Sequence, residues 1–252
     1  MDEKGRIIDV HAHILPGVDD GARDMDEALK MLKCAASQGI RAVIATPHCS
    51  RRRGVSGLES LLDALQESIR KEYPDFALYP GQETYYHEEL AECLNQGKAL
   101  TMAGSRYVLV EFDPGVSYEY LFRGIRSLLY AGYFPVLAHV ERYGCLYHEE
   151  RFAELNDAGC VYQMNYNSLE GRWTDRRVRW CRKQVRSGRI SFLGTDMHRM
   201  DFRPPGIKGA EKWMKSRGED RLWEEMTCRN PMRLLSGGRI MPAEMNLGRL
   251  TC

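Results

Sequence analysis

Short apolar segments alternate with amphipathic, helix-like segments along most of this chain. The apolar segments lack a strict in-and-out alternation, which is typical of parallel strands covered on both faces. Seven of them are expected to be strands, at residues 7–10, 42–45, 77–79, 107–110, 134–138, 161–164 and 191–193. Helices are expected to follow Asp24 and Ser56, and to lie near residues 87–96, 118–131, 149–158, 175–187 and 207–227.

The first two helices carry recognisable end signals. Asp24 can cap the first helix and Gly39 can end it. In the second, Ser56 and Glu59 have the spacing of a capping box. Apolar stripes at helical spacing follow these caps. They consist of Ala28, Leu29, Leu32, Ala35 and Ala36 in the first helix, and of Leu58, Leu61, Leu62, Leu65 and Ile69 in the second.

This alternation of strand and helix predicts an α/β fold with a parallel sheet. Seven repeats in 252 residues suit a closed or nearly closed barrel, and a doubly wound open sheet is the alternative. Polar residues that follow the strands favour the barrel, because a barrel brings all strand carboxyl ends onto one face. A single domain is expected over residues 1–252, with its core at about 7–235 and a weakly periodic extension at 236–252.

Five of the seven histidines stand in short motifs beside the expected strands. His11 and His13 form a His-x-His pair, and the period of two places both imidazoles on one side of an extended chain. Alone, the pair is a weak signal for a metal site, and two satisfied, partly buried histidines are the alternative. The recurrence of hard oxygen and nitrogen ligands at other strand ends instead implies several divalent metals in one pocket. The further candidates are Asp20, His48, Glu83, Glu111, His139, Asp196 and His198. His87 and His148 lie in helical patterns and are interpreted as surface residues.

Composition narrows the function classes. Lys and Arg total 36 against 35 Asp and Glu, so no bulk charge favours a nucleic acid or a membrane surface. No apolar run approaches the roughly 18–20 residues of a membrane span, and the amino terminus lacks a signal-peptide pattern. The eight cysteines contain no Cys-x-x-Cys pair and are expected to be free thiols. A cytoplasmic protein without a membrane span is expected.

The motifs together resemble the PHP superfamily, named for polymerase and histidinol phosphatase domains. More narrowly, they are similar to bacterial manganese-dependent protein-tyrosine phosphatases encoded with capsule and exopolysaccharide genes. The resemblance rests on IDVHAHILPGVDDGA, ATPH, GQETYY, LVEF, VLAHVERY and GTDMHRMDFRPP, and spans about residues 7–235. It implies a distorted (βα)7 TIM-like barrel of the PHP type, with three metals at the strand carboxyl ends.

The resemblance also implies a grouping of the ligands. The first metal would take His11, His13, Glu83 and Asp196, the second Glu83, Glu111 and His139, and the third Asp20, His48 and His198. Glu83 would bridge the first two metals, and Asp19 beside Asp20 leaves the third set open. Manganese is the expected metal, with iron, zinc or magnesium as alternatives.

Two arginines are expected at the phosphate. Arg142 and Arg203 match the residues that bind phosphate in the family that this chain resembles. The role suits arginine, because a guanidinium fits a phosphoryl group bidentately. Surface ion pairs are the alternative for both. Together with Asp20 they are the candidate catalytic residues. A water or hydroxide bridging two metals would attack phosphorus, since metal binding lowers the pKa of water from about 15.7 toward 7.

The expected activity is removal of phosphate from protein phosphotyrosine. The resemblance implies as partner a bacterial tyrosine autokinase with a tyrosine-rich tail, which controls capsule or exopolysaccharide synthesis. Histidinol phosphate or another small phosphoester is the alternative substrate, and a structural metal-binding protein is the non-enzymatic alternative. The sequence does not identify the kinase, the general acid or the oligomeric state.

Three further features bear on the expected function. The arginines at 51–53 suit either a basic rim for an acidic phosphopeptide or a solvated loop. Tyr85 and Tyr86 suit either stacking on a phenyl ring or packing of the rim. A cysteine-dependent phosphatase is disfavoured, because the Cys-x5-Arg spacing from Cys145 to Arg151 encloses two carboxylates and no glycine.

Overall fold

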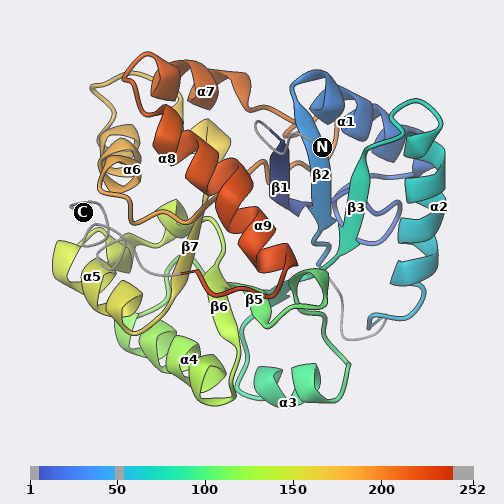
Figure 1. Cartoon of the computed structure of the whole chain (residues 1–252). Helices are drawn as coiled ribbons and strands as arrows, with labels where there is room; N and C mark the ends of the chain where they lie inside the picture. Colours follow the sequence, from blue (N-terminus) through green and yellow to red (C-terminus); the bar gives the residue numbers. More distant parts are fainter. Residues whose placement is uncertain (1–5, 49–53, 241–252) are drawn as a thin grey trace.

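The computed structural model describes residues 6–48 and 54–240, and its strands are all parallel (Figure 1). They are β1 (Ile7–Ala12), β2 (Ile40–Ala45), β3 (Ala77–Pro80), β4 (Glu83–Tyr85), β5 (Tyr107–Glu111), β6 (Phe134–Leu137), β7 (Val161–Asn165) and β8 (Phe192–Gly194). Two hydrogen-bonded groups result, in the orders β1-β2-β3 and β4-β5-β6-β7-β8. The predicted α/β class and parallel pairing are confirmed.

Helices surround the strands in Figure 1, and α8 and α9 cross one end of them. They are α1 (Met25–Ser37), α2 (Leu58–Arg70), α3 (Leu90–Asn95), α4 (Tyr118–Tyr130), α5 (Glu149–Asp157), α6 (Arg176–Arg186), α7 (Lys208–Lys215), α8 (Asp220–Glu224) and α9 (Asn230–Leu235). Among the described residues, no helix combines the length and apolar character that crossing a membrane requires.

Backbone hydrogen bonds join the two groups of strands near the carboxyl ends of β1, β2 and β8. At one junction, the backbone N–H of Glu83 donates to the carbonyl of Thr46 at 3.3 Å. At the other, Asp196 N–H donates to the carbonyl of His11 at 2.9 Å, and His13 N–H to that of Met197 at 2.9 Å. Residues that follow β1, β2 and β8 are therefore drawn together at one end of the molecule.

The third predicted strand is followed at once by another. Gly81 and Gln82 separate β3 from β4, with no helix between them, so the sequence-based count of seven missed one short strand. A Cβ on Gly81 would lie 2.8 Å from the Ile44 side chain and 3.1 Å from the carbonyl of Ala45. The chain therefore crosses close over β2 before it enters β4.

The end signals were confirmed for the first helix and were wrong for the second. Asp24 accepts from Glu27 N–H, and Gly39 follows α1 with a φ of 101°. The Ser56–Glu59 capping box does not form, because α2 begins at Leu58 after a left-handed Gly57 with a φ of 77°. The helix predicted over 207–227 is interrupted between α7 and α8, where Gly218 has a φ of 71°.

Side chains that alternate along the strands divide the interior into two layers. The larger apolar cluster lies between strands and helices and includes Val108, Val110, Tyr162 and Met164. The smaller cluster includes Tyr107 and Leu109 of β5, together with Val10, Ile44, Val136, Ala138, Val161, Phe192, Leu234 and Ile240. Since alternate residues of a strand face opposite ways, the second cluster fills the side of the sheets that the helices α1 to α7 do not cover.

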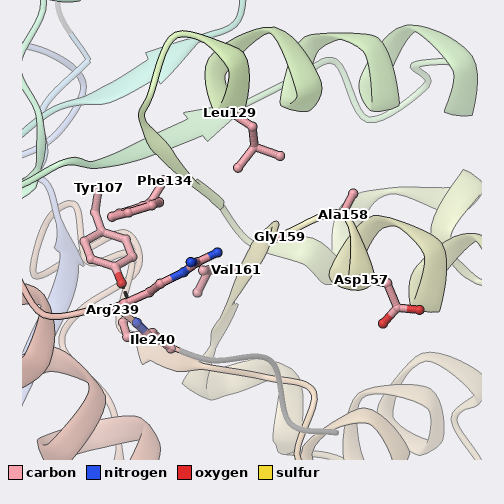
Figure 2. Close-up of a pocket in the computed structure, with 9 residues that line it drawn as sticks. All are labelled: Tyr107, Leu129, Phe134, Asp157, Ala158, Gly159, Val161, Arg239 and Ile240. Carbon is pink, nitrogen blue, oxygen red and sulfur yellow. Dashed lines mark hydrogen bonds between the residues drawn. The ribbon is translucent and has the colours of Figure 1, made fainter. Parts of the chain in front are cut away.

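A small pocket lies at the amino ends of β5, β6 and β7 (Figure 2). Tyr107, Phe134 and Val161 contribute to its lining, with Arg239 and Ile240 beside them. The Tyr107 hydroxyl accepts from Ile240 N–H at 2.7 Å and donates to the carbonyl of Gly238 at 3.1 Å. The start of the predicted extension is therefore attached to this end of the strands, and residues 241–252 lie outside the described residues.

Candidate metal centre

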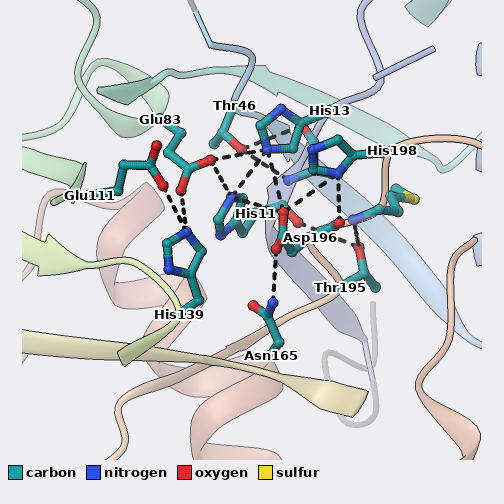
Figure 3. Close-up of polar contacts among 12 residues, drawn as sticks. His11, His13, Thr46, Glu83, Glu111, His139, Asn165, Thr195, Asp196 and His198 are labelled. Carbon is teal, nitrogen blue, oxygen red and sulfur yellow. Dashed lines mark hydrogen bonds and ion pairs between the residues drawn. The ribbon is translucent and has the colours of Figure 1, made fainter. Parts of the chain in front are cut away.

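All nine predicted ligands converge at the carboxyl ends of the strands (Figure 3 shows seven of them). His11 lies in β1, Glu83 begins β4, and Glu111 ends β5. His139 follows β6, and Asp196 follows β8. The remaining four are His13, Asp20, His48 and His198, on the segments that follow β1, β2 and β8. The expected convergence of distant motifs is thus observed, and only its chemical role stays a prediction.

Glu83 stands at the middle of the cluster. Its Oε2 lies 2.9 Å from His11 Nε2, 3.1 Å from His13 Nε2 and 3.4 Å from His48 Nε2. Its Oε1 lies 2.8 Å from His139 Nε2. The carboxyl is buried, so four imidazoles take the place of water around it. A carboxylate with one oxygen toward each of two groups of nitrogens has the form of a bridging ligand.

Three overlapping groups in this cluster have ligand atoms within 4.8 Å of one another. They are His11, His13, Glu83 and Asp196; His13, Asp20, His48 and His198; and His48, Glu83 and Glu111. The first equals the predicted first set, and the second adds His13 to the predicted third. The last has His48 where His139 was predicted, although His139 Nε2 does lie 3.1 Å from Glu111 Oε2.

The neighbouring aspartates Asp19 and Asp20 have different surroundings. Asp19 Oδ2 accepts from His13 Nδ1 at 2.7 Å and from His48 N–H at 2.8 Å, and Oδ1 accepts from Gly21 N–H. Asp20 is 67% exposed, with Oδ1 3.6 Å from His198 Nε2. Asp19 therefore orients the candidate ligand His13 through its Nδ1, whereas the Asp20 carboxylate is largely exposed beside His198, and its ligand role stays a prediction.

Hydrogen bonds fix which nitrogen of His11 faces the cluster. The Gln163 Oε1 accepts from the backbone N–H of His139 at 2.7 Å, which identifies that atom as the amide oxygen. The same oxygen lies 3.0 Å from His11 Nδ1, so Nδ1 must carry a proton and donate it. The lone pair of neutral His11 therefore belongs to Nε2, which faces Glu83 and Asp196.

Two other histidines are held in the same way. His13 Nδ1 donates to the Asp19 carboxylate, and His198 Nδ1 donates to the carbonyl of Asp196 at 2.9 Å. In each case Nε2 is left to face carboxylate oxygens. A bare nitrogen lone pair opposite a carboxylate is repulsive unless a cation lies between them. This orientation by outer hydrogen bonds is what metal-binding histidines require, so the residues fit divalent metals.

The protonation equilibria show the same demand for positive charge. Burial alone would lower the pKa of His13, but its hydrogen bonds to Asp19 and Glu83 raise that pKa to about 10. Burial alone would also lower the pKa of His139, but the charge of Glu83 and the hydrogen bonds to Glu111 and Glu83 raise that pKa to about 9. Burial would raise the pKa of Glu83, yet the charges of His11 and His139 hold it well below its usual range. Protons here occupy positions for which a metal cation would compete.

Both predicted arginines reach one oxygen of Asp196. Arg142 Nη2 lies 2.5 Å from Asp196 Oδ2, and Arg203 Nη1 lies 2.7 Å from it. Asn165 Nδ2 donates to the same oxygen at 2.8 Å, while Oδ1 faces His11 and His13 at 3.5 Å. The side chains of the two arginines are 29% and 27% exposed. They therefore stand between the buried cluster and solvent, with further N–H groups to offer.

Backbone strain gathers at the same place. Within the described ranges, four residues other than glycine have a positive φ, and three of them are His139 (33°), Asp196 (51°) and Arg203 (58°). A left-handed backbone costs a residue with a Cβ about 1 kcal/mol or more. Such residues persist where the surrounding structure holds them, and here it holds side chains of the cluster.

Sequence reasoning missed the polar residues of β7. Gln163 and Asn165 are buried, and Gln163 Nε2 donates to Asn165 Oδ1 at 2.9 Å. Together they connect His11, the His139 backbone and Asp196. A signal was available, because polar residues at two alternate positions near the end of an otherwise apolar strand are unusual in a parallel sheet.

Other expectations about side chains had mixed outcomes. His148 is exposed as predicted, whereas His87 is half-buried; both precede a helix, α5 and α3 respectively, so placing them within helices was wrong. Tyr85 is 54% exposed at the rim, whereas Tyr86 is buried and stacks on Phe112. The arginines at 51–53 lie outside the described residues.

The Cys145–Arg151 spacing does not build a thiolate site. The Arg151 guanidinium lies over the ring of Tyr118, 5.2 Å from the ring centroid, which is within the reach of about 6 Å of a cation–π contact. Burial raises the pKa of the Cys145 thiol, which disfavours the nucleophilic thiolate form. The reading that was disfavoured from sequence is disfavoured by geometry as well.

Comparison with known proteins agrees with this geometry. The chain is 30% identical over 241 residues to the tyrosine-protein phosphatase CpsB of Streptococcus pneumoniae, covering 91% of this chain and 98% of that one. It is also 30% identical over 207 residues to the tyrosine-protein phosphatase YwqE of Bacillus subtilis, covering 78% and 79%.

Solved structures show the same fold. One from a study of YwqE and CpsB as metal-dependent tyrosine phosphatases has a TM-score of 0.84 at 28% identity, covering 94% of this chain and 97% of that one. A phosphotriesterase homology protein from Escherichia coli has a TM-score of 0.57 at 12% identity, covering 93% and 100%, which shows likeness of fold alone. The family described as capsular polysaccharide synthesis, CpsB/CapC, matches residues 7–236. This chain is therefore a member of the CpsB/CapC family.

Proposed function

We propose that this chain is a metal-dependent phosphatase that hydrolyses protein phosphotyrosine. The observation that carries the proposal is the arrangement around Glu83, where ligand-type nitrogens face a buried carboxylate and two arginines stand at the mouth. Relatives named tyrosine-protein phosphatases support the choice of substrate class.

The proposed ligands are the nine residues of the cluster, holding three divalent metals, with manganese preferred over iron, zinc or magnesium. Bound divalent metals would supply a water of lowered pKa and would neutralise negative charge on the phosphate. His11, His13 and His198 offer Nε2, because their Nδ1–H groups are already engaged. Glu83 is proposed as the bridge, and Asp20 as the ligand at the mouth.

The arginines would bind and orient the phosphate. Each guanidinium contacts Asp196 through one nitrogen and keeps further N–H groups in the same plane. Their planar arrangement matches the oxygens of a phosphoryl group. Charge on the equatorial oxygens would be stabilised by Arg142 and Arg203 in the transition state. The leaving phenol has a pKa near 10, which reduces the demand for a strong general acid.

The wider setting follows from the family. We propose a single domain with a distorted (βα)7 PHP barrel, supported by the parallel strands and by the backbone bonds that join the two groups of strands at their carboxyl ends. A bacterial tyrosine autokinase of the capsule or exopolysaccharide system is the proposed protein substrate, and the cytoplasm is the proposed location. The family's description supports this setting.

The test compares two substrates. Phosphate release from a phosphotyrosine peptide and from histidinol phosphate is measured with metal-stripped protein, with and without added manganese. Manganese-dependent release from the peptide is expected. Preference for histidinol phosphate would contradict the substrate class, and release that survives chelation would contradict the metal mechanism.

Arg142→Gln gives a sharper version of this test. Loss of one charged phosphate contact is expected to lower kcat/KM by about 10²–10³, the scale of a lost transition-state donor. Because Arg142 also contacts Asp196, metal content is measured in parallel. Arg123→Gln, on the exposed side of α4, is the control and should leave both quantities unchanged. Unaltered kcat/KM in Arg142→Gln would remove this residue from the proposed site.

A further inference from the structure

An exposed basic segment borders the metal centre. Residues 171–177, here called the rim segment, are all exposed and lie between β7 and the first turn of α6. β7 ends at Asn165, whose side chain donates to Asp196 in the cluster. The rim segment follows the carboxyl end of that strand, and it therefore emerges on the same side of the strands as the metal centre.

The backbone of the rim segment is held in place from α6. Arg179 Nη1 donates to the carbonyls of Trp173 at 3.2 Å and Thr174 at 2.9 Å. Arg182 Nη2 donates to the carbonyl of Gly171 at 3.2 Å. Trp173 is nevertheless 74% exposed, so a well-anchored loop presents a large apolar side chain to solvent. Tryptophan in such a position is typical of residues that carry binding energy at interfaces.

Positive charge on the rim segment is not matched by nearby carboxylates. Within residues 6–48 and 54–240, no carboxylate lies within ion-pair distance of Arg172, Arg176 or Arg177. The nearby Asp175 accepts instead from the backbone N–H groups of Arg177 and Val178, as the cap of α6. These three guanidinium groups are therefore available to an external anion.

The other end of α6 differs. Lys183 pairs with Glu149 at 2.6 Å, and Arg186 pairs with Glu219 at 3.0 Å. Basic residues far from the metal centre are thus paired within the protein, and those at the near end are not. Both ends belong to one helix, so a general excess of surface arginine does not explain why, in the described part of the chain, only the basic residues near the metal centre are unpaired.

Exposed apolar residues also gather at this side of the strands. The described ranges contain five large exposed apolar residues. Four of them follow the carboxyl end of a strand or are the last residue of one, and Tyr130 is the exception. The four are Tyr85, Trp173, Met200 and Phe202. Exposed apolar side chains on the same side of the strands as a charged cluster suit a polypeptide that extends beyond the reacting group, rather than a compact metabolite.

We propose that the rim segment docks an acidic stretch of the substrate protein beside the reacting phosphotyrosine. Arg172, Arg176 and Arg177 pair with its carboxylates, and Trp173 packs against its apolar side chains. The inference rests on the proposed function, whose substrate class it narrows to acid-flanked phosphotyrosine. A lipid surface is the competing partner, but lipid recognition usually involves clusters of about four to eight basic residues.

The test uses two phosphotyrosine peptides of equal length. One carries Asp and Glu at roughly three to six positions from the phosphotyrosine on either side. At about 3.3 Å per residue of extended chain, these positions lie roughly 10–20 Å from the reacting group. The other carries Asn and Gln at those positions. The ratio of their kcat/KM values with the manganese-loaded protein is the readout, at low and at high salt.

The acid-flanked peptide is expected to be favoured by up to about ten-fold at low salt, the combined scale of three exposed ion pairs, and less at high salt. In the triple variant R172Q/R176Q/R177Q the ratio should fall to near one, through KM. The control K183Q/R186Q, at the paired end of α6, should keep the ratio of the unmodified protein. Equal ratios in the unmodified protein and the triple variant would overturn the proposal.

Two further measurements separate the alternatives. Binding of non-hydrolysable difluorophosphonate versions of both peptides is followed by fluorescence anisotropy. If neither phosphopeptide is hydrolysed, the proposed function fails, while a binding preference lost in the triple variant would still support docking. Sedimentation with vesicles of phosphatidylcholine, with and without phosphatidylserine, tests the lipid partner. Vesicle binding that the triple variant loses, with the peptide ratio unchanged, would overturn the proposal.

Discussion

The two ends of the same strands have opposite chemistry. On β5, Leu109 belongs to the apolar cluster and Glu111, two residues later on the same face, belongs to the metal centre. On β7, Val161 is in the apolar cluster, whereas Gln163 and Asn165 contact residues of the metal centre. The change from stabilising to functional side chains therefore takes place within about two residues along both β5 and β7.

This separation has a physical basis. The apolar end contains a cluster of buried hydrophobic side chains, among them Tyr107, whose hydroxyl has backbone partners. Burial of this kind stabilises the fold by about 25 cal/mol per Å² of apolar surface. The other end buries charges and holds positive φ angles at His139 and Asp196, both of which cost free energy. One end thus supports a site that would not be stable alone.

Glu83→Gln tests the functional end of the strands and is expected to have the largest effect on activity. The loss of the bridging carboxylate is expected to lower activity by more than about a hundred-fold, beyond the 10–100-fold scale of residues that only support a ligand. Metal content by mass spectrometry should fall in parallel, and circular dichroism should stay unchanged because the apolar cluster is intact. Glu88→Gln, at an exposed position nearby, is the control. Full metal content in Glu83→Gln would count against the bridging role.

Leu109→Ala tests the apolar end of the same interior. Removal of this fully buried side chain is expected to lower the free energy of unfolding by about 2–5 kcal/mol, as measured by urea denaturation. Metal content and kcat per folded molecule should not change. Tyr130→Ala removes a side chain that is 77% exposed and should alter stability by less than about 0.5 kcal/mol. A loss of kcat in Leu109→Ala at unchanged stability would contradict the division between the two ends.

Gln163→Met tests the boundary between the ends. The variant keeps the volume but removes the acceptor for His11 Nδ1–H and His139 N–H, so metal affinity is expected to fall by about 10–100-fold. Competition with a chelator of known affinity measures this. Gln184→Met is the matched control, because that glutamine is also fully buried but its side chain has no hydrogen-bond partner among the described residues. Equal affinity in both variants would mean that Gln163 has only a packing role.

The sequence predicted the strands well and the join between them poorly. Each of the seven predicted strands overlaps an observed one, because apolar runs mark buried parallel strands reliably. β4 was missed, since its residues Glu83–Tyr85 are polar or aromatic and belong to the site. The Ser56 cap failed because Gly57 adopts a left-handed conformation, a choice that depends on the surrounding loop.

For the metal centre, motifs identified the residues but not their partners. Short motifs such as HAH and TDMH are enough to identify candidate ligands in a single sequence, and the family that they indicated is confirmed. The outer contacts of Gln163, Asn165 and Asp19 depend on strand register and side-chain direction, which no motif records. Distinguishing Asp19 from Asp20 required the same information, since both follow the same turn.

The junction between β1 and the end of β8 can form only late in the synthesis of this protein. Thr195 contacts the carbonyl of His11 across 184 positions of sequence. At synthesis rates of roughly 5–20 residues per second, the first histidines leave the ribosome on the order of ten to forty seconds before Asp196 is added. A growing or truncated chain therefore carries HAH without the carboxylate that completes its group, so only a nearly finished polypeptide can become an active enzyme.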